Sequence, residues 1–210
     1  MELARAIAAG TAQYVILGAG LDTFAYRHRY SRKELKVFEV DHPDTQAWKR
    51  RRLADAAIPV PPEVSFVPFD FQRQGLDIEL KNAGLRLSEP AFFSLLGVAP
   101  YLANPVVMAI FALIHSLCPK NMVVFDYLKP RQTLGAWERA GFDVLSEEVA
   151  RGGEPFRGFF LPEALIRGLK RIGYQRIESP TKDQLNACYF RDRLDALILQ
   201  GDLHGLMRAN

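Results

Sequence analysis

Short apolar runs alternate with longer amphipathic stretches along this chain from Gln13 onward. The runs are nearly continuous rather than alternating, which is typical of strands buried on both faces of a sheet. Glycine, proline or aspartate stands at or just beyond the end of each run, as expected where a strand meets a turn. The predicted strands cover residues 14–17, 36–41, 64–68, 91–97 and 122–126.

Helical spacing of apolar residues fills the intervals between these strands. Prolines after residue 57 stop the first helix, and Pro105 suits the first turn of a later one. The predicted helices cover residues 44–57, 75–83, 105–117 and 161–172. Residues 129–160 are rich in glycine and charge, so they predict an irregular segment with weak helical character over 134–140.

Five strands that alternate with helices specify an open parallel α/β sheet with right-handed crossovers. Two late strands, 174–179 and 206–209, with a short helix at 188–190 between them, would add a hairpin-like edge. We find no internal repeat and no low-complexity segment. The sequence therefore predicts a Rossmann-like α/β fold, with residues 1–210 forming a single domain.

Composition argues against several function classes but does not identify the function. The 27 Lys and Arg against 24 Asp and Glu give too small an excess to argue for nucleic acid, and the basic run 49–52 is interpreted as the solvated face of a helix. No apolar run approaches the roughly 18 residues of a membrane span. Two cysteines without a Cys/His cluster fit a reducing cytoplasm and predict no metal site.

Candidate chemistry gathers at the predicted carboxyl ends of the strands, where open α/β sheets bind ligands. The glycine-rich turn 18–22 follows the first strand, and glycine lets a backbone approach a ligand closely. Asp41 ends the second strand, where a carboxylate can accept hydrogen bonds from both hydroxyls of a ribose. Glu39, on the same strand face, could share that role, and Asp70 ends the third strand. These features together predict a ligand that contains a nucleoside.

Two residues of the turn bear on which nucleoside ligand fits. Thr23 replaces the third glycine of the dinucleotide fingerprint, and Asp22 places a negative charge where a pyrophosphate would bind. Both disfavour NAD and an NAD-dependent oxidoreductase. They favour S-adenosylmethionine, whose ammonium and sulfonium groups tolerate nearby carboxylates. Asp22 could contact that ammonium or cap the following helix.

Several blocks of the sequence carry a family resemblance. They are QYVILGAGLDTFAYR at 13–27, FEVDHP at 38–43 followed by Lys49-Arg50, FFSLLGVAPYL at 92–102, GEPFR at 153–157 and LNACYF at 185–190. Together these blocks resemble the leucine carboxyl methyltransferase family, which covers bacterial S-adenosylmethionine-dependent O-methyltransferases. The resemblance runs from about Gln13 to the C-terminus.

The resemblance implies a seven-stranded methyltransferase sheet with a reversed last strand. It also implies that the glycine turn lies beside the cofactor, with Asp41 on the ribose and with Asp70 and Phe71 around the adenine. The residues expected to bind S-adenosylmethionine, or its product S-adenosylhomocysteine, are Gly18, Ala19, Gly20, Asp22, Asp41, Asp70 and Phe71.

The chain departs from the family pattern at two places. Family members carry a helical segment ahead of the glycine motif, but only thirteen residues precede Tyr14, so we expect this N-terminal cap to be largely absent. Leu96 precedes Gly97, where much of the family has a glutamate near the cofactor's amino group. An uncapped sheet face would expose apolar surface, which a second copy of the chain could cover in a homodimer.

The expected reaction is methyl transfer to a carboxylate or an acidic hydroxyl of a small molecule. A carboxylate is already ionised at neutral pH and needs no general base, and the sequence offers no clear His or Lys for that role. Tyr101 and Arg157 are the candidate acceptor-binding residues, since an arginine can orient an anion. A solvated loop position is the alternative for Arg157. The alternative for the whole chain is a catalytically silent remnant that binds nucleosides or another protein.

Overall fold

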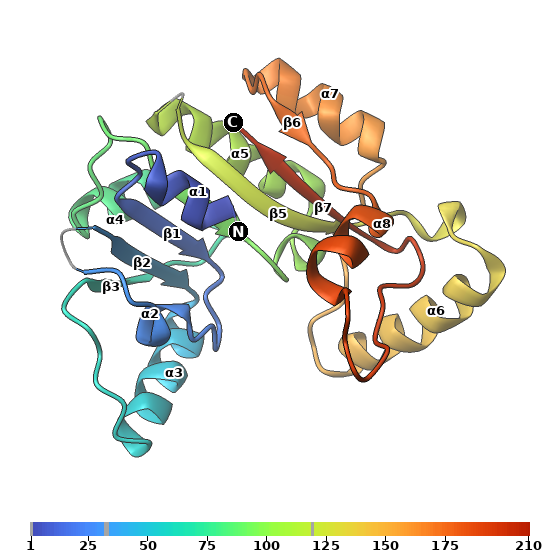
Figure 1. The fold of residues 1–210 in the computed structure, drawn as a ribbon, viewed down its shortest axis with the longest axis horizontal. Coiled ribbons are helices and arrows are strands. Elements are labelled where there is room, and N and C mark those ends of the chain that lie inside the picture. The colour runs from blue at the N-terminus through green and yellow to red at the C-terminus, as the bar shows by residue number, and fades with distance from the viewer. Residues whose placement is uncertain (1, 32–33, 119) are drawn as a thin grey trace.

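A computed structural model describes residues 2–31, 34–118 and 120–210. Within these residues, seven strands form one sheet (Figure 1). The strands lie in the order β3-β2-β1-β4-β5-β7-β6. Their bounds are β1 Gln13–Leu17, β2 Lys36–Asp41, β3 Val64–Pro68, β4 Phe92–Leu95, β5 Met122–Leu128, β6 Ile177–Glu178 and β7 His204–Ala209. Strands β1 to β5 pair in parallel, whereas β7 runs antiparallel to β5 and β6. The Rossmann-like class with a reversed last strand is therefore confirmed.

Helices cover both faces of the sheet. Helices α4, α5 and α7 pack on one face around the larger core cluster, and α1 and α2 pack on the other around a smaller cluster. Helix α3 belongs to the second face, because its Lys49 contacts Glu39 of β2. The bounds are α1 Glu2–Ala8, α2 Phe24–Arg27, α3 Pro43–Asp55, α4 Leu76–Asn82, α5 Asn104–Leu117, α6 Ala136–Arg151, α7 Pro162–Ile172 and α8 Lys182–Leu185.

The central strands β1 and β4 are buried at every position. This burial on both faces is what their nearly continuous apolar sequences predict. Burying each large aliphatic or aromatic side chain contributes about 1.5–3 kcal/mol, so these strands carry much of the fold's stability. They also fix the positions of the loops at their carboxyl ends.

The prediction for residues 129–160 was wrong, because α6 occupies sixteen of them. In this helix Phe142 is the residue that is buried, whereas Trp137 and Val144 are each 66% exposed. Helices are predicted from apolar residues that recur on one face, and exposed apolar residues on other faces obscure that spacing. The helix begins at a capping interaction instead, in which Glu138 Oε2 accepts a hydrogen bond from Gly135 N at 3.0 Å.

Other differences are small in extent. Helices α1 and α2 were not predicted, β5 continues two residues beyond the predicted Asp126, and β6 is confined to Ile177–Glu178. The short helix expected at 188–190 is a π-helix over Asn186–Phe190. Among the described residues, none of the helices combines the length and apolar character that crossing a bilayer requires.

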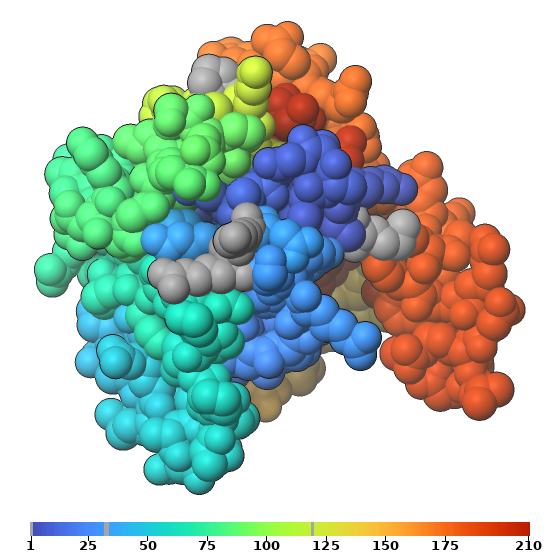
Figure 2. Space-filling view, turned by 60° about the vertical axis from the view of Figure 1, so that its left-hand side comes forward, coloured from blue at the N-terminus to red at the C-terminus, as the bar shows by residue number. Residues whose placement is uncertain are grey.

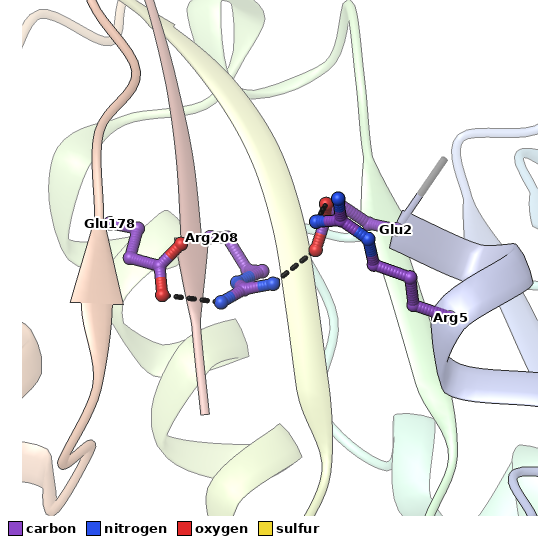
Figure 3. A network of polar contacts seen from close by, with 4 residues as sticks. All are labelled: Glu2, Arg5, Glu178 and Arg208. Atoms are coloured by element: carbon purple, nitrogen blue, oxygen red, sulfur yellow. Dashed lines mark hydrogen bonds and ion pairs between the residues drawn. The ribbon is translucent and has the colours of Figure 1, made fainter. Parts of the chain in front are cut away.

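The first helix is tied to the last strand. Arg208 of β7 forms ion pairs with Glu2 of α1 and Glu178 of β6, and Glu2 also pairs with Arg5 at 2.8 Å (Figure 3). A cavity of about 620 Å³ lies between α1, β7 and the π-helix. Figure 2 shows the segment around α8, in red-orange at the right, projecting beside the dark blue α1. The homodimer expected through the uncapped face of the sheet stays a prediction.

Candidate functional site

Loops that follow β1, β2, β3 and β4 surround a cavity of about 400 Å³. They lie at the carboxyl edge of parallel strands, where open α/β sheets bind ligands. Most of the residues singled out in the sequence meet here. Those that line the cavity are Gly18, Gly20, Asp41, Asp70, Phe71, Tyr101 and Arg157.

The turn after β1 requires glycine at position 18 for two reasons. Gly18 has a φ of +73°, in the left-handed region that disfavours side chains. A Cβ atom at this position would also lie 2.2 Å from Cγ2 of Val98. Gly20 has a φ of +43°, but a Cβ there would meet no atom within 4 Å. The turn is thus packed against Val98 on one side and open at Gly20.

Asp41 is held between the glycine turn and the start of α3. Its Oδ2 accepts a hydrogen bond from Gly20 N, and its Oδ1 accepts one from His42 N at 2.7 Å. An ionised carboxylate has about four lone-pair sites, so two remain for further donors. Because Asp41 also lines the cavity, it can accept hydrogen bonds from a ligand without releasing the turn.

The loop after β3 supplies a polar and an aromatic residue to the same cavity. Asp70 Oδ1 accepts a hydrogen bond from Gln72 N at 2.9 Å, which closes a turn of the kind aspartate favours. The ring of Phe71 lies edge-on to Phe69, with ring centroids 5.9 Å apart. Asp70 therefore shapes its own loop and lines the cavity at once.

Ala19 and Asp22 do not line the cavity. Ala19 is 3% exposed and packs in the smaller core cluster behind the turn. Asp22 accepts a hydrogen bond from Phe24 N at 2.6 Å, at the start of α2. This bond reaches the first N–H of α2, whose N-cap residue is Thr23. The contact with the cofactor's ammonium that was considered for Asp22 stays a prediction.

Glu39 lies behind the cavity rather than in it. It is 1% exposed, and its Oε2 lies 2.8 Å from Nζ of Lys49, which is itself buried. The prediction of a solvated helix face was therefore wrong at Lys49, although it describes Arg50 and Arg51, which are exposed. The sequence alone did not reveal that α3 turns Lys49 toward β2.

The turn after β4 completes this side of the cavity. Gly97 has a φ of +70°, lines the cavity, and donates its N–H to Asp126 Oδ1 of β5 at 2.8 Å. Burial raises the pKa of the Asp126 carboxyl, and the Gly97 N–H opposes that shift. Leu96, at the position where much of the family has glutamate, is 49% exposed and does not line the cavity.

Residues 153–155 and Arg157 line the opposite side of the cavity. The backbone N–H groups of Arg157 and Gly158 both donate to Pro100 O, at 2.7 and 3.0 Å. A Cβ at Gly158 would lie 2.3 Å from Ala99 O, so only glycine allows this close approach. The backbone of Arg157 is thereby fixed, while its side chain is exposed and lines the cavity.

Comparison with models of known protein families shows which family the chain belongs to. The family model described as leucine carboxyl methyltransferase matches residues 2–115, more than half of the chain. The chain belongs to the leucine carboxyl methyltransferase family. The matched region contains the glycine turn, Asp41, Asp70 and Tyr101, and ends before Arg157. The resemblance seen in the sequence is confirmed.

Relatives of this leucine carboxyl methyltransferase family member agree with the assignment. The protein YktD of Bacillus subtilis, provisionally named an S-adenosyl-L-methionine-dependent methyltransferase, is 34% identical over 196 residues, 93% of this chain. The chain spans 64% of the length of that relative.

Solved structures share the fold. One is a protein of Thermobifida fusca described provisionally as a methyltransferase, with a TM-score of 0.64, 19% identity, and coverage of 99% of this chain and 78% of its own. Another is magnesium protoporphyrin IX methyltransferase from Synechocystis with bound SAH, with a TM-score of 0.55, 13% identity, and coverage of 99% and 78%. At such identities the likeness shows the methyltransferase fold.

Several cavity residues of this family member were not singled out from the sequence. They are His42, Thr45, Phe69, Gln72, Gly97, Val98, Leu102, Gly153, Glu154 and Pro155. Seven of these ten residues lie inside the family blocks quoted from the sequence, and Phe69 directly follows β3, so the blocks and the strand end are the signal that could have found them. His42 Nδ1 accepts a hydrogen bond from Asp44 N at 3.3 Å and so caps α3.

Proposed function

We propose that this chain binds S-adenosylmethionine in the cavity at the carboxyl edge and transfers its methyl group to a small-molecule acceptor. The observation that carries the proposal is the link between Asp41 and the glycine turn, in which Gly20 N donates to the carboxylate that lines the cavity. The names of the relatives support the same cofactor. They also give no support to the silent-remnant alternative.

The residues present fit this cofactor. Gly20 and Gly97 line the cavity, and a Cβ on either would meet no atom within 4 Å, so the space beside them is open. Asp41 keeps lone pairs for ribose hydroxyls, and Phe71 offers an apolar ring beside Asp70 for adenine. When bound, S-adenosylmethionine supplies a methyl group on a positively charged sulfur, which an oxygen nucleophile can attack.

The acceptor proposed is a carboxylate or an acidic hydroxyl. Arg157 is exposed on the cavity wall and can form paired hydrogen bonds to an anion. His42 also lines the cavity, but it lies beside Asp41 and Asp70 and its Nδ1 already accepts from Asp44 N. An ionised acceptor needs no base, so the protein's task is alignment and exclusion of water.

Calorimetric titration with S-adenosylmethionine and S-adenosylhomocysteine tests the cofactor site. The variant Asp41→Ala should weaken binding at least about tenfold, because hydrogen bonds to a charged group are worth about 1.5–3 kcal/mol. Asp44→Ala is the matched control, since that carboxylate is 94% exposed and outside the cavity. Equal affinities for Asp41→Ala and the wild-type chain, or no binding by a folded wild-type chain, would contradict the proposal.

A further inference from the structure

We propose that Tyr26, Glu39 and Lys49 are positioning residues that fix the glycine turn and Asp41 in the geometry needed for cofactor binding. The inference rests on the proposed function, because it concerns the same cavity. None of the three residues lines that cavity, so each would act through others.

The three side chains meet at one carboxylate oxygen. Glu39 Oε2 accepts a hydrogen bond from the Tyr26 hydroxyl at 3.1 Å and lies 2.8 Å from Lys49 Nζ. The Lys49 ammonium also lies 5.4 Å from the centroid of the Tyr26 ring, within range of a cation–π interaction. Burial and the Glu39 carboxylate raise the pKa of Tyr26, so its hydroxyl stays a donor at physiological pH.

Each member of this triad comes from a different segment around the site. Tyr26 lies in α2, which begins just after the glycine turn, and Lys49 lies in α3, which begins two residues after Asp41. Glu39 lies in β2, two residues before Asp41. Gln46 of α3 adds a further link, donating from Nε2 to Glu39 O at 3.0 Å.

The two segments that form the cofactor side of the cavity are joined at three places. In the backbone, Gly18 N and Ala19 N both donate to Val40 O of β2, at 2.8 and 3.0 Å. Gly20 N and the Asp41 carboxylate join them at the cavity, and the triad joins them behind it. Without the triad, the hydrogen bonds that join the turn to β2 end at Gly20, so α2 could rotate about the turn and carry Gly20 away from Asp41. The triad removes this freedom.

Stability alone explains the triad poorly. The free energy needed to remove two charges from water offsets much of the free energy gained from their attraction. Well-packed apolar residues in the same place often stabilise a fold equally or more. Among the described residues, Glu39 Oε1 has no hydrogen-bond partner, and Lys49 Nζ contacts Glu39 as an ion pair without a hydrogen bond of good geometry, which adds to the cost. A charged network fixes orientation more sharply than apolar contacts do, since its donors and acceptors must stay aligned.

Two variants test the triad. Tyr26→Phe removes only the hydroxyl and keeps the ring. Removing Lys49 alone would leave a buried charge without a partner, so the second variant combines Glu39→Gln with Lys49→Met and removes both charges. Tyr174→Phe is the matched control, because its buried hydroxyl donates to Phe111 O at 3.0 Å in the other core cluster.

The measurements are amide hydrogen exchange of the ligand-free chain and calorimetric titration with S-adenosylhomocysteine. We expect exchange over residues 18–24 to speed up about tenfold in both triad variants, with α5 unchanged. We expect affinity to fall about three- to tenfold, which is less than the loss of a direct hydrogen bond to a charged group, because the triad acts through the turn. Tyr174→Phe should leave residues 18–24 and the affinity unchanged.

The proposal is overturned if exchange over 18–24 and affinity both stay at wild-type values in the two triad variants. It is equally overturned if exchange rises uniformly through α5, since that result indicates a purely structural role. A folded wild-type chain that binds no S-adenosylhomocysteine contradicts the proposed function instead. Exchange over the turn needs no ligand, so it still decides whether the triad holds the turn in place.

Discussion

Replacing Gly18 by alanine separates two physical effects that the glycine turn combines. The first is the left-handed backbone, at a φ of +73°. The second is the approach of Val98, whose Cγ2 would lie 2.2 Å from the new Cβ. Gly20→Ala is the matched control, because Gly20 also has a positive φ, +43°, but open space beside it.

The magnitudes of the two effects can be assigned separately. A side chain in the left-handed region costs about 1–2 kcal/mol, and both variants bear this cost. Forcing an extra carbon into a packed site costs about 1–3 kcal/mol more, and Gly18→Ala alone bears it. We therefore expect Gly18→Ala to lower the free energy of unfolding by about 2–5 kcal/mol, which lowers Tm by at least about 4 °C.

Urea unfolding followed by circular dichroism measures both variants. The double variant Gly18→Ala with Val98→Ala should recover the steric part, as a coupling free energy of about 1–3 kcal/mol. Gly20→Ala should unfold at a slightly lower urea concentration than the wild-type chain. It should also bind S-adenosylhomocysteine weakly, since the methyl group of the new alanine occupies the cavity. If Gly18→Ala were no less stable than Gly20→Ala, the close approach of Val98 would be refuted.

Three further predictions concern charged groups. Arg208→Met should destabilise the chain by about 1–3 kcal/mol, because Glu178 loses its ion-pair partner and Glu2 keeps only Arg5. The loss in urea unfolding should shrink in 1 M salt, and an equal loss at both salt levels contradicts it. Burial raises the pKa of Asp126, so ionisation of this group opposes folding: Asp126→Asn should raise Tm at pH 7, with a gain that fades toward pH 4, and a loss of Tm at pH 7 contradicts it. Arg157→Ala should raise the acceptor KM about tenfold or more, unlike the exposed control Arg151→Ala, and an unchanged KM rejects its role.

The parts of the fold predicted from sequence are those where one residue pattern has one physical meaning. The nearly continuous apolar runs at β1 and β4 indicate burial on both faces, and every position of both strands is buried. Because parallel strands place their carboxyl ends at one edge, Asp41 and Asp70 could be predicted to meet, and both line the cavity. Helix α6 escaped prediction because Trp137 and Val144 face solvent.

What the sequence could not provide was pairing between elements. Lys49 begins a run of four basic residues, a pattern that predicts a solvated helix face. However, α3 crosses over β2 and places Lys49 against Glu39. That crossing depends on the three-dimensional path of the chain and leaves no trace in residue spacing. The same holds for Arg157, whose position depends on two hydrogen bonds to Pro100 O.

The position of β7 in the sheet has a consequence for synthesis of the protein. β7 lies between β5 and β6, and β6 joins the described sheet through β7. β5 ends at residue 128 and β7 begins at 204, an interval that a ribosome working at roughly 5–20 residues per second takes about 4–15 s to translate. Throughout it, one edge of β5 is unpaired and can template pairing with another chain. A chaperone that protects the nascent protein would therefore have to cover β5 during this interval.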